Sequence, residues 1–114
     1  MSPANSVYGL LGLARRAGGA VPGTEAVREA VREGRARLVL LAEDAAPSQL
    51  EKVERTLAGR PAPRVSFGDR SGLGAALGRR PVSAVAVTQA SLAGRILAEI
   101  EKDSVVVAST GAEG

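Results

Sequence analysis

The chain has 114 residues, a net charge of +3 and neither cysteine nor histidine. We therefore expect one domain with its own core, and we exclude disulfides, cysteine or histidine metal sites and histidine-based catalysis. No apolar run approaches the roughly 20 residues that cross a bilayer, and the N-terminus lacks a signal-peptide pattern, so we expect a soluble, cytoplasmic domain with no membrane partner and no cofactor.

Helical periodicity predicts three amphipathic helices in the first half of the chain. Apolar residues recur at i, i+3, i+4 and i+7 over about residues 5–17, and a pair of glycines ends this helix. A second helix is expected from Thr24, its predicted N-cap. Ser48 and Glu51 match a capping box, which predicts that a third helix begins there.

Short apolar runs predict the strands. Leu38–Ala42 has no polar alternation and is too short for an ordinary helix, so we expect a central strand covered on both faces. Residues 64–67 alternate like a strand, and residues 82–87 form a second buried strand rich in small and β-branched side chains. Residues 20–21 predict a very short strand. A short helix ending at Gly78 and a last helix after the second buried strand complete the alternation.

This alternation predicts the α/β class, in a three-layer α/β/α sandwich with helices on both faces of one sheet. Residues 1–102 are expected to form a single domain without internal repeats or linkers. The tail, residues 103–114, contains three consecutive valines from Val105. It either adds an edge strand or stays loose, and the sequence leaves both interpretations open.

The positive charge is concentrated in two separate segments. Residues 1–37 hold six arginines and three acids, and residues 64–80 hold four arginines and one acid. If the fold joins these segments, they form a basic patch of the kind that binds nucleic acid; otherwise they are two solvated faces. Tyr8 and Phe67 are the only aromatic residues. RNA recognition would therefore depend on arginines, helix N-termini and backbone amides rather than on base stacking.

No catalytic constellation is visible. Glu43 and Asp44 follow the central strand, where ligands often bind in open α/β sheets. The favoured interpretation of this acid pair is nevertheless an ordinary polar loop. Gly72-Leu73-Gly74 lacks the fuller glycine pattern of a phosphate loop. We therefore predict that the protein is not an enzyme.

The start of the second helix is the better binding candidate. Gly23, Thr24 and Glu25 stand where free amides and a partial positive charge suit a phosphate or a base edge. Glu25 could accept from a guanine or cytosine amino group, and Arg28, one turn on, could reach a phosphate. The alternative is an ordinary helix start with an N-cap and a surface ion pair.

Five strings in this order resemble a known family. They are Leu10–Gly18, Gly23–Val27, Gly34–Asp44, Leu73–Gly78 and the small-residue strand from Val82. Together they resemble the kink-turn RNA-binding ribosomal protein family of the L-seven-Ae and L-thirty-e type, over about residues 6–98, and are closest to its small bacterial ribosomal-protein-like branch. The resemblance implies an α/β/α sandwich with a mixed, about four-stranded sheet.

The resemblance also implies an RNA site. In the family, a polar pair at the start of the second helix reads the sheared guanines of the kink-turn, and a loop before the last strand covers a protruding nucleotide. These positions fall on Thr24 and Glu25 and on the loop from Arg79. Phosphate contacts are expected from the nearby arginines, and close backbone approach from Gly23. The expected RNA-binding residues are Gly23, Thr24, Glu25, Arg28, Arg32, Arg79, Arg80, Val82 and Ser83.

The resulting hypothesis is a non-enzymatic protein that binds structured, kink-turn-like RNA and is associated with the ribosome or translation. The charge distribution and the resemblance point to the same two segments. The alternative is an adaptor that binds proteins on the same fold without specific RNA binding. A third interpretation, a small enzyme, would need a pocket with a carboxylate or lysine of perturbed pKa.

Overall fold

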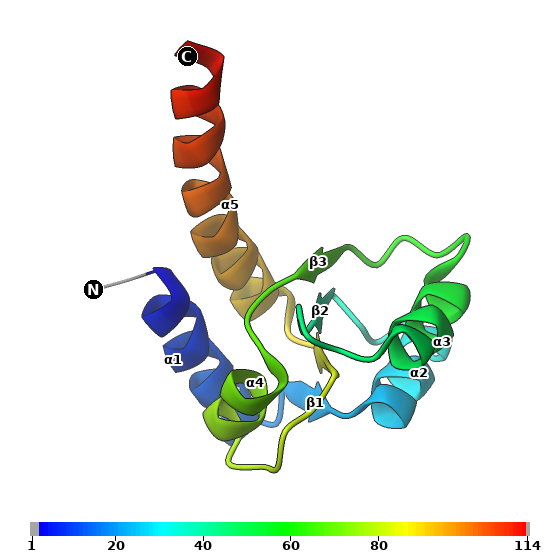
Figure 1. Cartoon of the computed structure of the whole chain (residues 1–114). Helices are drawn as coiled ribbons and strands as arrows, with labels where there is room; N and C mark the ends of the chain where they lie inside the picture. Colours follow the sequence, from blue (N-terminus) through cyan, green and yellow to red (C-terminus); the bar gives the residue numbers. More distant parts are fainter. Residues whose placement is uncertain (1–2, 114) are drawn as a thin grey trace.

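A computed structural model describes the backbone of residues 3–113 and the side chains of residues 5–102. Helices and strands alternate strictly along this part of the chain, as the periodicity predicted. Figure 1 shows the path of the chain. The elements are α1 (Pro3–Arg16), β1 (Ala20–Pro22), α2 (Thr24–Arg32), β2 (Leu38–Leu41), α3 (Pro47–Leu57), β3 (Arg64–Ser66), α4 (Arg70–Ala76), β4 (Ala84–Val87) and α5 (Ala90–Glu113).

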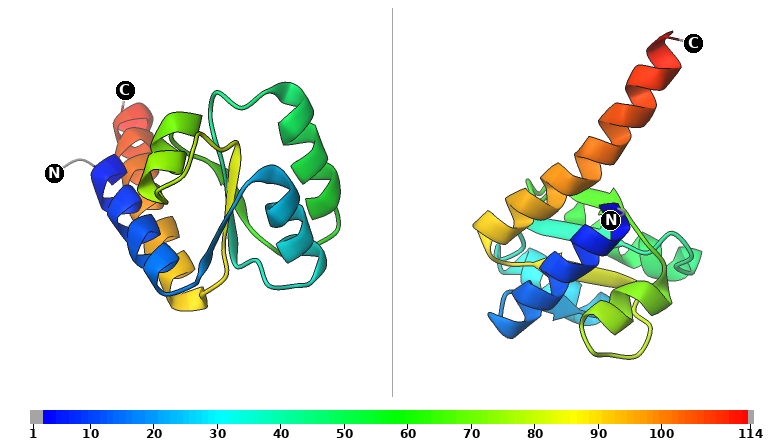
Figure 2. Two further views of the ribbon diagram at one scale, coloured as in Figure 1. Left: turned by 90° about the horizontal axis from the view of Figure 1, so that it is seen from below. Right: turned by 90° about the vertical axis from the view of Figure 1, so that its left-hand side faces the viewer.

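The four strands form one mixed sheet in the order β1-β4-β2-β3. Strand β4 is antiparallel to both of its neighbours, whereas β2 and β3 are parallel. Helices α1, α4 and α5 cover one face of the sheet, and α2 and α3 cover the other (Figures 1 and 2). The predicted three-layer α/β/α sandwich with a four-stranded mixed sheet is therefore confirmed.

The central strands supply both halves of the core. Every residue of β2 and of β4 is buried. Because side chains alternate along a strand, Leu38 and Leu40 pack under α1 and α5, while Val39 and Leu41 pack under α2 and α3. The run without polar alternation thus reflects a strand covered on both faces, as expected.

Two helices begin differently from the prediction. Gly23, not Thr24, is the N-cap of α2, and no side chain caps this helix. Gly23 has φ 102°, a conformation that glycine adopts readily, so the chain turns from β1 into α2 within one residue. Ser48 likewise opens no capping box, because α3 already begins at Pro47, whose fixed φ suits the first helical position.

The tail also differs from both expectations. Helix α5 continues to Glu113 and projects beyond the sheet, as Figure 1 and the right-hand view of Figure 2 show. A helix satisfies its backbone hydrogen bonds internally, so this segment needs no strand partner. The sequence left an edge strand or a loose tail open, and a continuous helix replaces both. None of the described helices combines the length and apolarity needed to cross a membrane.

Candidate nucleic-acid interface

The start of α2 offers free backbone donors. The N–H of Gly23 donates to the carbonyl of Ala84 at 2.9 Å, and the N–H of Val27 donates to the carbonyl of Gly23 at 2.9 Å. No side chain caps the N–H groups of Thr24 and the next two residues. A helix start with uncapped N–H groups and a partial positive charge is suited to an anion or a base edge.

Arg28, one of the predicted site residues, is held by two neighbouring side chains. Its Nη1 lies 2.9 Å from the carboxylate of Glu25, and its Nε donates to Thr56 Oγ1 of α3 at 2.9 Å. The Arg28 side chain is 25% exposed and that of Glu25 68% exposed. The surface ion pair of the alternative interpretation is therefore present. Glu25 is open to solvent, while Arg28 must exchange a partner before its guanidinium reaches a phosphate.

The loop between α4 and β4 is fixed by close backbone packing. The N–H of Arg79 donates to the carbonyl of Gly74 at 2.8 Å, and the N–H of Val82 to that of Arg70 at 3.1 Å. A Cβ on Gly74 would collide with the carbonyl of Arg80, so only glycine fits beneath this loop. Arg79 and Arg80 are exposed.

The sheet register brings the two predicted groups together. Strand β1 pairs with β4 so that Pro22 lies opposite Val85, and the hydrogen bond from Gly23 to the Ala84 carbonyl continues this ladder. Val82 and Ser83, both partly exposed, immediately precede Ala84. The start of α2 and the end of the loop are therefore neighbours at one edge of the molecule.

Arg15 joins this edge, which the sequence analysis did not predict. Its guanidinium lies over Gly78: a Cβ at that glycine would be 3.2 Å from Arg15 Cζ. Residues 1–37 and 64–80 therefore meet here, through Arg15 and the loop that begins at Arg79. The charge count contained this signal, but a cation in the last turn of a helix such as α1 is also explained by the helix dipole, so the sequence did not single out Arg15.

Arg32 is the predicted site residue most distant from this edge. It lies in the last turn of α2, about 12 Å along the helix from Thr24. Its carbonyl accepts from Arg60 at 3.5 Å, close to the chain that leads to β3. The structure therefore groups Arg32 with the far end of α2 and does not bring it to the loop that carries Arg79.

The two aromatic side chains pack against each other instead of forming a platform. Tyr8 and Phe67 make an edge-to-face contact with ring centroids 5.5 Å apart. The Tyr8 hydroxyl lies against Gly68 and Gly72. Burial, and then the nearby charge of Asp69, raise the pKa of Tyr8 above its ordinary value. Base stacking uses exposed rings, whereas both of these rings are only partly exposed.

The acid pair after β2 is structural. Asp44 accepts from the backbone N–H of Arg70 at 2.8 Å, and its carboxylate lies 3.5 Å from Arg70 Nε. The hydrogen bond from the Arg70 backbone is the main cause that lowers the pKa of Asp44. The N–H of Glu43 donates to the carbonyl of Gly68 at 2.8 Å. These contacts fasten the start of α4 to the end of β2, as expected for a polar loop.

Acid should weaken the contacts between the Asp44 carboxylate and Arg70. Because the folded-state pKa of Asp44 is lowered, its carboxylate stabilises the fold above the ordinary value of 3.8, and this contribution is lost as the pH falls through the folded-state value. Asp44→Asn should therefore lower the free energy of unfolding at neutral pH and change it little in strong acid. Urea unfolding at several pH values measures this difference. Glu43→Gln is the control, and an equal effect of both variants would contradict the assignment.

Solved structures share this fold. A protein of unknown function from Bacillus halodurans C superimposes with a TM-score of 0.78 at 32% identity, covering 83% of this chain and 96% of its own. The Giardia lamblia 15.5kD RNA binding protein superimposes with a TM-score of 0.68 at 22% identity, covering 86% of this chain and 83% of its own. At 22% identity, the similarity to the Giardia lamblia protein shows a shared fold alone.

Sequence comparison identifies the family. Residues 5–96 match the ribosomal protein L7Ae/L30e/S12e/Gadd45 family. The RNA-binding protein YlxQ of Bacillus subtilis (strain 168) is 34% identical over 94 residues, which cover 82% of this chain and 94% of that protein. The chain belongs to the L7Ae/L30e/S12e/Gadd45 family and, like the members it resembles, it is not an enzyme.

Proposed function

We propose that this protein binds structured RNA of the kink-turn type and acts in the cytoplasm with the ribosome or another translation-associated RNA. The observation that carries the proposal is the meeting of the uncapped start of α2 with the arginine-bearing loop before β4. Free amides and exposed arginines on one edge suit a folded RNA backbone. YlxQ, described as an RNA-binding protein, adds independent support.

Each predicted residue has a role in this proposal. Thr24 and Glu25 contact base edges, since both lie in the uncapped first turn of α2. Gly23 allows close backbone approach, because its N-cap position carries no Cβ. Phosphate contacts come from four arginines, and the end of the loop covers a protruding nucleotide. These phosphate-binding and loop residues are Arg28, Arg32, Arg79, Arg80, Val82 and Ser83.

A binding titration tests the proposal. The purified protein is titrated against a labelled kink-turn RNA and a straight RNA duplex of equal length, at about 50 mM and about 200 mM salt. Tighter binding to the kink-turn at both salt concentrations is the expected result. Equal and strongly salt-dependent binding to both RNAs would mean that the protein binds through a basic patch without recognising the kink-turn. No binding at low salt would reject RNA binding and favour the protein adaptor.

Glu25→Gln should change the choice of RNA more than the overall affinity. The substitution keeps the size of the side chain, weakens the oxygen that accepts from a base amino group by removing its charge, and releases Arg28 from its ion pair. An exposed pair of this kind contributes little to stability, about 0–1 kcal/mol. The ratio of the two affinities, kink-turn to duplex, should fall.

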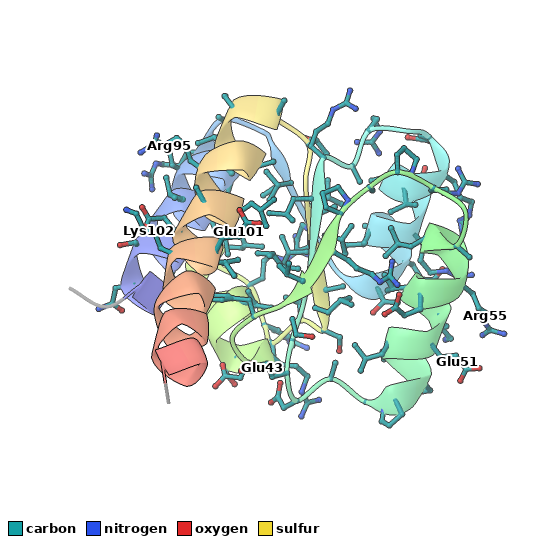
Figure 3. All side chains as sticks on the ribbon, turned by 90° about the horizontal axis from the view of Figure 1, so that it is seen from above. Glu43, Glu51, Arg55, Arg95, Glu101 and Lys102 are labelled. Atoms are coloured by element: carbon teal, nitrogen blue, oxygen red, sulfur yellow. The ribbon has the colours of Figure 1, made fainter. Side chains whose placement is uncertain are left out.

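Glu51→Gln provides the matched control for this variant. Glu51 projects from the outer side of α3 beside Arg55, away from the loop before β4 (Figure 3). The Glu51→Gln substitution removes the same negative charge from an exposed position on a helix. An equal change of the affinity ratio in both variants would contradict a base contact by Glu25.

A further inference from the structure

A hollow opens where α1, β1 and the loop after α4 meet. It has a volume of about 120 Å³ and is lined by Arg15, Ala20, Pro22, Leu77 and Arg79. One arginine comes from the last turn of α1 and the other from the loop. The other three lining residues are apolar.

Among the side chains of residues 5–102, the two arginines of this hollow have no acidic partner. Among the described side chains, no ion pair involves Arg15 or Arg79, whereas Arg28, Arg64 and Arg70 each pair with a carboxylate. Two guanidinium groups on one hollow repel each other. Such an arrangement gains most from an anion between them, and guanidinium groups bind phosphate oxygens through paired hydrogen bonds.

We propose that this hollow binds one backbone phosphate of the RNA, with Arg15 as a phosphate ligand that extends the interface onto α1. This inference rests on the RNA binding proposed above. Pro22 lines the hollow and Thr24 is two residues further on, at most about 7 Å away along the chain. One RNA strand can therefore contact the start of α2 and the hollow together. The apolar lining residues suit the ribose next to the phosphate.

The competing explanation assigns Arg15 a role in stability only. A cation in the last turn of a helix stabilises it slightly through the helix dipole, and Arg15 occupies that turn of α1. This explanation predicts a small loss of stability on substitution and no change in RNA binding. RNA affinity and its salt dependence therefore separate the two roles.

The test compares three single variants, Arg15→Gln, Arg79→Gln and Arg55→Gln. Arg55 is the matched control: it is exposed, has no ion pair among the described residues and projects from the outer side of α3 (Figure 3). Binding of a kink-turn RNA is measured over a range of salt concentrations. Each of the first two variants should reduce the slope of log affinity against log salt by about 0.9 and weaken binding roughly tenfold at about 50 mM salt. Arg55→Gln should match the wild type.

The outcomes distinguish the two proposals. If Arg79→Gln weakens binding while Arg15→Gln matches the control, Arg15 is only a helix-end cation and the inference is overturned. If both match the control while the wild type binds RNA, the phosphate lies elsewhere and the proposed function survives. If the wild type binds no RNA at low salt, both proposals fail. Thermal unfolding of every variant confirms that the fold is retained.

Discussion

Gly74→Ala should destabilise the protein and weaken RNA binding together. A Cβ at this buried glycine would collide with the carbonyl group of Arg80 and lie 3.0 Å from the carbonyl oxygen of Arg79. Both obstacles are backbone atoms, so α4 or the loop must move. Overpacking of this kind costs about 1–3 kcal/mol. Because the loop carries two of the proposed phosphate ligands, its displacement should also reduce the affinity for RNA.

Gly9→Ala is the matched control for this substitution. Gly9 lies within α1, and a Cβ there would meet no atom within 4 Å. Alanine favours a helix over glycine by about 1 kcal/mol, so this variant should be as stable as the wild type or more so. Urea unfolding and RNA titration of both variants measure the difference. Equal stability and equal affinity of the two variants would contradict close packing of the loop on α4.

Leu40→Ala should cause the larger loss of stability, about 2–5 kcal/mol. Leu40 is fully buried in β2, between β4 and β3 and beneath α1 and α5. Neighbours on both sides of the strand are themselves fixed in the sheet, so the cavity cannot collapse easily. Domains are typically stable by about 5–15 kcal/mol. The loss is therefore a substantial share of the total.

Leu13→Ala removes the same atoms from the surface. Leu13 is 40% exposed on α1, and we expect its substitution to change the free energy of unfolding by about 0.5 kcal/mol or less. Denaturant unfolding curves of the two leucine variants give the comparison. A small effect at Leu40, similar to that at Leu13, would mean that β2 is not the centre of the core.

The order of the elements could be predicted because it depends on local patterns. Helical spacing from Val7 onward and the unbroken run Leu38–Leu41 each reflect which faces are buried, and burial is set by the layers of the sandwich. Helix starts were less predictable. Thr24 has the chemistry of an N-cap, but the positive φ of Gly23 begins α2 one residue earlier.

The grouping of the candidate site residues could be predicted only where neighbours in sequence are neighbours in space. Gly23, Thr24 and Glu25 belong to one helix start, so their grouping follows from the chain itself. The contact of Arg28 with Thr56 spans 28 residues, and no local pattern encodes it. The hollow shared by Arg15 and Arg79 likewise depends on how α1 and α4 end on the same side of β1.

We propose that the RNA binds at the edge formed by the start of α2 and the loop before β4. The most direct measurement is a map of backbone amide NMR shifts on titration with a kink-turn RNA. The largest changes are expected on Gly23–Glu25 and on residues 78–83. Changes centred instead on the outer side of α3, around Glu51–Arg55, would contradict it.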